Sequence, residues 1–455
     1  MCAHPQPPGI TGTVVHRGGG GYEEARAKAL WNDLKPERHP EVIVRAASES
    51  DVVAAVGWAR ERGLRIAVRS GGHSWCGSPL RDGGLLLDLS ALRRCEIDAA
   101  SATARVQPGL TGGELTRALA REGLAFPTGH CGSVALGGYL LSGGLGWNSR
   151  HWGVACAGVR RIEAVTADAR TVVCDAEQNP ELFWAAKGAG PGFPAVVTAF
   201  HLALRPRRAA LAATTQVFPL EAVEAVVRWA VSASAELPSL VEPTLVLGTA
   251  TGDPAGPRTV MVTATAFADS PEEAARALAP LRTCPLTERP LARDADLPTS
   301  LDALYAGSAE VWPEGLRYAA DTLWSSADHP TLLTRLGEAI AEAPSPRSLV
   351  LAPVTPVSRE EGLTADMAFS VLGESYAVPY AVWEDSRDDD RNVRWLRRTV
   401  EAVEPLTTGH YIAEADLTAD PSRARRCFAP ADWERLRRVR AAWDPQGAFH
   451  SYLSG

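Results

Sequence analysis

The stretch that decides the fold is PTGHCGSVALGGYLLSGGLGW, residues 127–147. Seven glycines fall between Gly129 and Gly146. A packed core helix is not expected to accept that density, since each interior glycine costs about 0.5–1 kcal/mol relative to alanine. Such a density of glycines is tolerated where the backbone lies against a ligand. No lysine follows as in a P-loop, and no G-x-G-x-x-G follows a strand, so phosphate binding by either common loop is excluded.

A second glycine-containing loop lies upstream, in RSGGHSW at residues 69–75. It follows RIAVR, residues 65–69, which has the composition of a strand. Two glycines after a strand let the backbone approach a phosphate, and successive N–H groups can form an anion-binding nest. The alternative is a glycine-rich turn that carries a surface histidine.

Between residues 41 and 206 short apolar runs alternate with helical patterns, which favours α/β or α+β layers. Strands are predicted at 41–46, 65–69, 84–89, 95–97, 103–106, 159–166, 171–174 and 196–204, the last of them half-buried. Helices are predicted at 49–62, with Ser48 or Ser50 as N-cap, and at 112–122.

After residue 206 the pattern changes to runs of strands followed by helices, which indicates an antiparallel sheet with helices on one face. The predicted strands are 214–218, 245–249, 259–267, 348–354 and 376–383, and the predicted helices are 220–235, 271–281, 330–343 and 389–403.

Composition excludes several classes of protein. The chain has 46 basic and 54 acidic side chains and a formal charge of −8, so it offers no basic stripe for nucleic acid. No run of about 18 apolar residues predicts a membrane span, and the N-terminus lacks the pattern of a signal peptide. A cytoplasmic monomer or small homo-oligomer is expected. The eight cysteines form no C-x-x-C pair, and no cluster has metal-ligand spacing, so no metal is expected.

The motifs RSGGHSW, GHCGSVALGGYLLSGGLG and ELFWAAKGAG (residues 181–190) together resemble the vanillyl-alcohol-oxidase superfamily, within it the berberine bridge enzyme-like branch. The terminal WDPQGAF, residues 443–449, agrees. The resemblance implies an α+β fold: a PCMH-type FAD-binding domain of two subdomains, and a substrate domain whose antiparallel sheet is backed by helices. The expected boundaries are a lead-in at 1–37, the FAD domain at 38–207, the substrate domain at 208–407, and a C-terminal segment at 408–455 that returns to the FAD domain.

The resemblance also implies residue roles. His73 stands where the family bonds the flavin 8α carbon, and Cys131 where it bonds flavin C6, so the FAD is expected to be bicovalently bound. Imidazole nitrogen and thiolate are both nucleophiles, and oxidised flavin is electron-poor. For Cys131 the alternative is a buried small hydrophobe.

The remaining cofactor contacts are expected from the two loops and their neighbours. Ser70 to His73 and Ser142 to Gly146 are expected to cradle the pyrophosphate, and Val134 stands near the family's oxygen gatekeeper, where a small residue accompanies oxidases. Val134 packing against the ring is the alternative. The full set of expected contacts besides the two tethers is Arg69, Ser70, Gly71, Gly72, Ser74, Gly129, Val134, Gly137, Gly138, Ser142, Gly143, Gly144, Gly146 and Val196.

Three tyrosines are candidates for the catalytic machinery. Strand alternation places Tyr376 and Tyr380 on one face with Val378. Tyr411 follows Gly409-His410 in a segment that resembles the family's C-terminal strand. The base is expected to be Tyr411 with Tyr380 assisting, with core packing as the alternative for both. Pro379 and Ala413 replace the family's usual Gln and Asn. Trp312, Tyr318 or Trp324 are expected to share the inner face of the sheet.

These observations predict an FAD-dependent oxidase that takes hydride from a C–H next to an alcohol or amine of a small organic molecule to flavin N5. Dioxygen would then return the flavin to its oxidised form and give hydrogen peroxide. The alternatives are a dehydrogenase that uses another acceptor and an inactive ligand-binding member of the fold.

Overall fold

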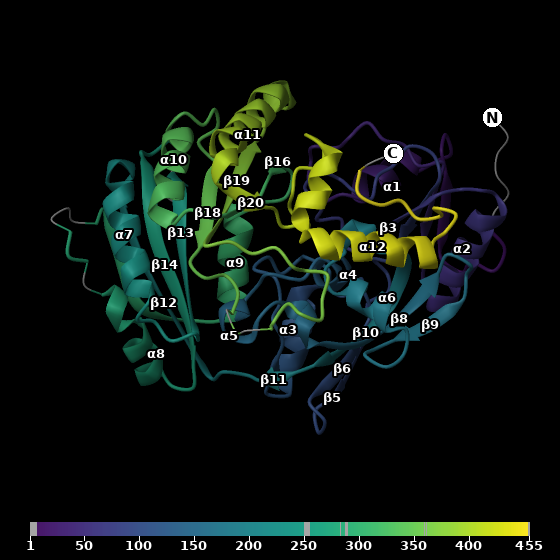
Figure 1. The fold of residues 1–455 in the computed structure, drawn as a ribbon, viewed down its shortest axis with the longest axis horizontal. Coiled ribbons are helices and arrows are strands. Elements are labelled where there is room, and N and C mark those ends of the chain that lie inside the picture. Colours follow the sequence, from purple (N-terminus) through teal and green to yellow (C-terminus); the bar gives the residue numbers. More distant parts are fainter. Residues whose placement is uncertain are drawn as a thin grey trace.

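The described part of the chain folds into three larger β-sheets and one two-stranded sheet, with helices between and outside them (Figure 1). The computed structural model describes residues 7–249, 255–282, 284–286, 290–358, 360 and 362–453. Two smaller sheets are built from the N-terminal half, and one large antiparallel sheet from the C-terminal half. The predicted α+β class is confirmed.

The first small sheet has the order β1-β2-β4-β3. Its strands are β1 (Thr13–His16), β2 (Val42–Arg45), β3 (Ile66–Arg69) and β4 (Leu85–Asp88), and only β1 is antiparallel to its neighbour. The parallel strands are connected through helix α2 (Glu49–Glu61), whose N-terminus is capped by the Ser48 hydroxyl accepting the Asp51 N–H. Parallel strands have their C-terminal ends at the same edge of the sheet, and the loop after β3 begins at that edge.

The second small sheet is antiparallel, with the order β5-β6-β10-β8-β9. Its strands are β5 (Cys95–Asp98), β6 (Thr103–Val106), β8 (Val159–Thr166), β9 (Thr171–Cys174) and β10 (Ala195–Ala203), and β7 (Leu124–Ala125) pairs with β11 (Arg205–Pro206). The associated helices are α3 (Gly112–Arg121), α4 (Leu136–Leu141), α5 (Ser149–Trp152), α6 (Pro180–Ala186) and α12 (Pro430–Trp443), and α1 (Tyr22–Lys28) lies near β1 and β2.

The large sheet has the order β15-β12-β14-β13-β18-β19-β17-β20, with β16 also paired to β19. The strands are β12 (Ala210–Pro219), β13 (Val241–Thr249), β14 (Arg258–Ala268), β15 (Ala292–Thr299), β16 (Arg317–Ala320), β17 (Leu323–Ser325), β18 (Leu349–Pro353), β19 (Ser375–Trp383) and β20 (Thr407–Gly409). Helices α7 (Val223–Ser234), α8 (Pro271–Leu278), α10 (His329–Ala341) and α11 (Asp389–Val403) cover one face (Figure 1), and α9 (Leu301–Val311) contacts α3.

The two faces of β19 are distinct, as its alternation predicts. Ala377, Ala381 and Trp383 join the core under the helices. Tyr376, Val378 and Tyr380 join a different cluster, together with residues from the N-terminal half. The tyrosine face of the large sheet therefore points away from its helices and toward the two smaller sheets.

The C-terminal segment returns to the first small sheet. The Ile66 N–H donates to the Ala448 carbonyl at 2.7 Å, and Phe449 bridges Ile66 in parallel. Helix α12 runs beside α6, and in Figure 1 it crosses the part of the molecule that holds the small sheets. The strand that carries the first glycine loop is thus held by a segment nearly 400 positions later in the chain.

Several elements differ from the sequence-based expectation. Helices α9 and α12 and edge strand β15 were not predicted from the sequence. The β15 segment, ARDADLPT, is largely exposed and does not have the composition of a strand. Strand β10 was expected to be half-buried, but seven of its nine residues are buried, and only His201 and Ala203 are partly exposed. Strands β6 and β8 flank β10, and α2 packs against it.

The glycine-dense stretch was not expected to form a packed helix, and this expectation is wrong for residues 136–141. Gly137 and Gly138 lie in the short buried helix α4. A Cβ on Gly137 would lie 2.2 Å from the Ser70 Oγ atom and 2.9 Å from Pro108 Cβ. The glycine is needed here because the loop after β3 passes directly over the helix.

We expect the Asp51 carboxylate to be a main stabilising contact of the first sheet. It is fully buried and accepts hydrogen bonds from the backbone N–H groups of Thr11 (3.0 Å), Gly12 (2.9 Å) and Ala47 (2.9 Å). Asp51→Ala would leave these donors unpaired and should lower the free energy of unfolding by about 2 to 4 kcal/mol. Urea denaturation followed by circular dichroism measures it. Glu61→Ala, at the exposed end of the same helix, is the control and should change stability by less than about 0.5 kcal/mol; equal effects would contradict the assignment.

Candidate active site

Two nucleophilic side chains meet at a single hydroxyl. His73 lies in the loop after β3, and Cys131 lies in the loop before α4. The Ser133 Oγ atom is 3.1 Å from the His73 Nε2 atom and 3.2 Å from the Cys131 Sγ atom. Residues 58 positions apart in the sequence are therefore neighbours in space. Ser133 was not among the residues predicted from the sequence, although its place two residues after Cys131 could have indicated it.

His73 is held in a form that can act as a nucleophile. Its ring stacks on Trp31, with centroids 5.0 Å apart and planes inclined by 20°. Burial, and secondly the charge of Arg69, lowers the pKa of His73 to about 4. The imidazole is therefore neutral near pH 7, with a lone pair available on one ring nitrogen.

A close approach of the two loops brings these side chains together. A Cβ on Gly71 would lie 2.8 Å from the Ala135 Cβ atom and 2.9 Å from its backbone nitrogen. Any side chain at position 71 would push the loops apart and separate His73 from Ser133. The glycine of the first motif is thus explained by contact with the second motif.

The other predicted cofactor residues divide into those that face open space and those held by the protein. Gly138 is exposed, and no atom lies within 4 Å of the Cβ it lacks. Val134 is half-buried, and Gly129 lies beside the Tyr139 ring. Ser74 accepts a hydrogen bond from the Ser78 N–H.

Arg69 and Val196 lie in protein surroundings. The Arg69 guanidinium donates to Asp88 at 2.8 Å and to the Ala29 carbonyl at 3.1 Å, so it braces the loop after β3. Gly72 lies against that same Ala29 carbonyl. Val196 is fully buried in the core that α2 shares with the small sheets.

The second half of the glycine-dense stretch packs against other parts of the chain. Cβ atoms on Gly143, Gly144 and Gly146 would clash with Phe369, Ala155 and the Thr128 carbonyl, respectively, and Ser142 is buried. These glycines allow tight packing of the loop on the protein. Contacts with a ligand would have to come from the backbone on their other sides.

The three predicted tyrosines line one cavity of about 90 Å³, between the large sheet and the cofactor loops. Tyr376 and Tyr380 come from β19, and Tyr411 follows β20. His130, adjacent to Cys131, and Gly146 contribute from the second glycine loop. The cavity therefore adjoins the place where His73 and Cys131 meet.

The aromatic residues expected on the inner face, together with Trp75, pack around the two β19 tyrosines. The Trp75 ring lies 5.7 Å from the Tyr380 ring and 5.4 Å from the Tyr318 ring, measured between centroids. Trp312 contacts Tyr380 with centroids 5.7 Å apart, and Trp324 contacts Tyr376 at 4.3 Å. This aromatic packing fixes the positions of the two β19 tyrosines.

Two half-buried carboxyls in the cavity wall, Glu242 and Glu414, were missed from the sequence. The Tyr380 hydroxyl donates to Glu414 at 3.3 Å, and the Trp75 Nε1 atom donates to it at 3.4 Å. Glu242 lies on β13 in VEPTLVLGT, where an acidic residue in an otherwise apolar or hydroxylated strand was the available signal. Glu414 follows Tyr411 by three positions, which one turn of chain places on the same side.

Burial sets the protonation of these groups. Burial, and secondly the nearby Glu414, raises the pKa of Tyr380 well above its usual value. Burial likewise raises the pKa of Tyr411, whose hydroxyl accepts the N–H groups of Gly144 at 3.1 Å and Leu145 at 3.4 Å. Both phenols are thus protonated near neutral pH. Burial also raises the pKa of Glu414, and a carboxylate remains the stronger base candidate beside Tyr380.

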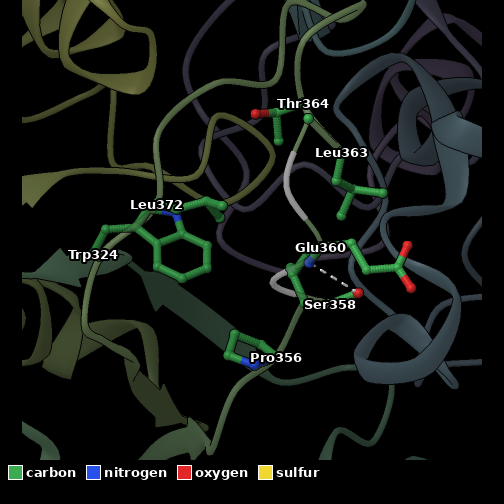
Figure 2. Close-up of a pocket in the computed structure, with 10 residues that line it drawn as sticks. Trp324, Pro356, Ser358, Glu360, Leu363, Thr364 and Leu372 are labelled. Atoms are coloured by element: carbon green, nitrogen blue, oxygen red, sulfur yellow. Dashed lines mark hydrogen bonds between the residues drawn. The ribbon is translucent and has the colours of Figure 1, made fainter. Parts of the chain in front are cut away.

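A second cavity, of about 230 Å³, lies on the far side of Pro356, which lines both (Figure 2). The Trp324 indole, Leu363 and Leu372 give it apolar walls, and Ser358, Glu360 and Thr364 add polar groups (Figure 2). Trp324, which lines this cavity, packs on Tyr376, which lines the first, so the two cavities are neighbours.

These residues fit a covalently held flavin. An imidazole nitrogen and a sulfur arrive from two loops at one point, and the side chains of His73, Trp75, Cys131 and Val134 are each partly exposed. Partly exposed groups gathered at one place are what a planar cofactor would cover. The seven described cysteines are free thiols, so Cys131 is not engaged in a disulfide.

Other kinds of site are absent from the described part of the chain. In it, no group of three or more His, Cys, Asp or Glu side chains could hold a metal ion. Within the same residues, no helix is both long and apolar enough to cross a bilayer.

Comparison with known proteins agrees with this geometry. A family model described as an FAD binding domain matches residues 40–175. The FAD-linked oxidoreductase ptmO of Penicillium ochrochloron is 33% identical over 428 residues, which cover 93% of this chain and 92% of that protein.

Two solved structures share the fold. The crystal structure of 6-hydroxy-D-nicotine oxidase from Arthrobacter nicotinovorans superposes with a TM-score of 0.85 at 24% identity, covering 97% of each chain. The berberine bridge enzyme of Eschscholzia californica superposes with a TM-score of 0.81 at 18% identity, covering 97% of this chain and 96% of that one.

The Glu242 carboxyl predicts a stability that falls with rising pH. Burial raises the pKa of Glu242 from 4.5 to about 8. Between these values the folded protein holds a proton that the unfolded chain has released, so raising the pH through this window favours unfolding. The penalty reaches at most about 5 kcal/mol above pH 8. Glu242→Gln should melt like the wild type near pH 5 and at a higher temperature near pH 9.

Thermal unfolding across this pH range, followed by circular dichroism, measures the difference. Glu224→Gln, at an exposed carboxylate paired with Arg228 on α7, is the control and should follow the wild type throughout. Parallel curves for wild type and Glu242→Gln would show that the carboxyl is ionised in the folded protein.

Proposed function

Because the chain belongs to the FAD-linked oxidoreductases and has the berberine bridge enzyme-like fold, we propose that it is an oxidase of alcohols or amines with bicovalently bound FAD. That it is an FAD-dependent oxidoreductase follows from the family. The tethers, the kind of substrate and the use of dioxygen are the proposed part. The observation that supports it most is the meeting of His73 and Cys131 at the Ser133 hydroxyl, beside a cavity lined by tyrosines.

A bound FAD would supply the hydride acceptor for the carbon next to the substrate oxygen or nitrogen, and dioxygen would accept the two electrons, with two protons, to give hydrogen peroxide. The protein supplies the rest. Neutral His73 and the Cys131 thiol each offer one nucleophilic atom for a covalent bond. The Ser133 hydroxyl, within hydrogen-bonding distance of both, positions the two side chains toward one another.

Glu414 is the proposed proton acceptor, with Tyr380 as its partner. The substrate hydroxyl or amine must lose a proton as hydride leaves the adjacent carbon. Glu414 lines the cavity and accepts the Tyr380 hydroxyl, so a proton can reach it directly or through Tyr380. Tyr411, expected from the sequence to be the base, instead receives two backbone N–H groups and orients the loop at Gly144 and Leu145.

The cavities suggest how the rest of a substrate is accommodated. The reacting end would occupy the space under Tyr376, Tyr380 and Glu414. A larger apolar portion would extend past Pro356 toward Trp324 and Leu363 (Figure 2). A dehydrogenase with another electron acceptor is the second candidate, and Val134 beside Cys131 favours the oxidase. The rate at which air reoxidises the reduced flavin separates the two.

Replacement of the tethering residues should release the flavin in two steps. His73→Ala and Cys131→Ala should each keep flavin on the acid-denatured chain through the remaining bond, and the double variant should release all of it. Acid precipitation followed by absorbance of the pellet and supernatant measures this. Cys76→Ala, three residues after His73 with its sulfur near Ser74 and Ser78, is the matched control and should retain flavin fully. Flavin in the supernatant of the wild type would contradict both tethers.

Glu414→Gln should lower kcat/KM by about 10²- to 10⁴-fold, the usual contribution of a general base. A screen of alcohols and amines for peroxide release identifies the substrate used. Because burial raises the pKa of Glu414, the acid limb of the wild-type pH profile should lie above the ordinary carboxyl range, with activity rising as Glu414 loses its proton.

The pH profile separates this assignment from a tyrosine base. Glu414→Gln should abolish the acid limb, whereas Tyr411→Phe should keep it. If Tyr411→Phe removes the limb and Glu414→Gln retains it, Tyr411 is the base.

A further inference from the structure

The charge in the active-site cavity is unbalanced. Two carboxyls, Glu242 and Glu414, line a space whose one lining arginine among the described residues is Arg150. Most of the other lining side chains are tyrosines and apolar groups such as Leu351 and Val378. The proton acceptor proposed above accounts for Glu414 only. Glu242 has no part in that chemistry, and a carboxyl with one oxygen shielded from water and unpartnered is costly to keep.

Strand register aims Glu242 into the cavity. In β13, Val241, Leu245 and Leu247 pack into the core under the helices. Glu242 and Thr244 therefore point to the opposite face, the one that carries Tyr376 and Tyr380 on β19. Within the described residues the Glu242 Oε2 atom has no hydrogen-bond partner, although it is shielded from solvent.

The nearest cation does not form an ion pair that satisfies this carboxyl. Arg150 lies beside Glu242, but its guanidinium donates to backbone carbonyls, to Val241 at 2.6 Å and to Ser234 at 3.1 Å. Burial raises the pKa of Glu242. This outweighs the opposing effects of the backbone N–H groups of Asn148, Arg150 and Ser149 and of the Arg150 charge. The carboxyl therefore holds a proton until a cation arrives.

No other lining side chain among the described residues brings a positive charge. Burial lowers the pKa of His130 to about 4, so its ring is neutral. An anionic substrate would meet two acids in this wall and, among the described lining residues, only the Arg150 guanidinium, which already donates to the Val241 and Ser234 carbonyls. A neutral polyol would leave the carboxyls protonated, whereas an ammonium ion would ionise one of them, and the flanking tyrosine rings offer electron-rich faces to the same charge.

We propose that the cavity binds its substrate as an organic ammonium ion, with the Glu242 carboxylate as the counter-ion. This inference rests on the proposed function and narrows its substrate class from alcohols or amines to amines. Before hydride can leave the neighbouring carbon, one N–H bond of the ammonium must break, and its proton passes to Glu414. Glu242 thus binds the positively charged ammonium group, and Glu414 accepts the proton whose loss leaves the amine neutral.

The test compares two probes of the same shape, benzylamine, which is charged at neutral pH, and benzyl alcohol, which is not. Binding to the flavin-loaded protein is followed without turnover, from the change in the flavin absorbance under anaerobic conditions and from calorimetry. We expect benzylamine to bind at least tenfold more tightly than benzyl alcohol. Glu242→Gln should weaken benzylamine binding at least tenfold and leave benzyl alcohol binding unchanged.

Calorimetry in buffers of different ionisation enthalpy gives a second readout. Benzylamine should release protons from the wild-type protein, because Glu242 ionises, and fewer from Glu242→Gln. Glu242→Asp keeps the charge and should retain part of the preference. Glu224→Gln, an exposed carboxylate of the same sheet's helices, should behave as the wild type. Melting curves confirm that each variant is folded.

Equal affinity for the two probes, no binding of benzylamine, or unchanged benzylamine affinity in Glu242→Gln would each overturn the inference. A failure of this inference can be distinguished from a failure of the proposed function. If the protein retains flavin after acid precipitation and its reduced flavin gives peroxide in air, while benzylamine shows no preference, only the substrate class is wrong. If the flavin is released by acid, the tethers are wrong, and the comparison of probes still reports on Glu242.

Discussion

The contact on which the site depends is the packing of one loop on another without an intervening side chain. Gly71 lies so close to Ala135 that a Cβ there would overlap it, and this proximity is what places His73 and Cys131 around the Ser133 hydroxyl. The loop after β3 is held from behind by Arg69, which bridges Asp88 and Ala29, and its strand is held by the returning C-terminal segment at Ala448. Rigid placement of reactive atoms is worth more in rate than their intrinsic reactivity.

Burial determines the chemistry of the cavity. Charged forms are disfavoured where water is excluded, so His73 and His130 are neutral, the tyrosines keep their protons, and the pKa values of Glu242 and Glu414 rise. The same effect separates the roles of the two acids. Glu414 contacts Tyr380 and Trp75, and so suits proton transfer, whereas Glu242 keeps an oxygen without a partner and suits a charged ligand.

Much of the fold was predictable from the sequence, because the spacing of apolar residues that marks a helix or a strand is a local property of the chain. Alternation in SYAVPYAVW placed Tyr376 and Tyr380 on one face, and the helix at 389–403 was expected with the bounds that α11 has. Edge strand β15 and helix α9 were missed, since their residues are largely exposed and their structure depends on neighbours. Glycine-dense motifs indicated the cofactor loops, but not that Gly143, Gly144 and Gly146 face protein side chains.

The sequence by itself indicated the family and the cofactor class, and it predicted His73 and Cys131 as the tethering nucleophiles, because short motifs carry residue types whose chemistry does not depend on distant contacts. Only the tertiary structure decided which acid lies beside which tyrosine. Glu242 and Glu414 are 172 positions apart and line one cavity only after β13, β19 and the segment after β20 come together with the glycine loops. Protonation follows from burial, and burial is a property of the assembled layers rather than of any stretch of chain.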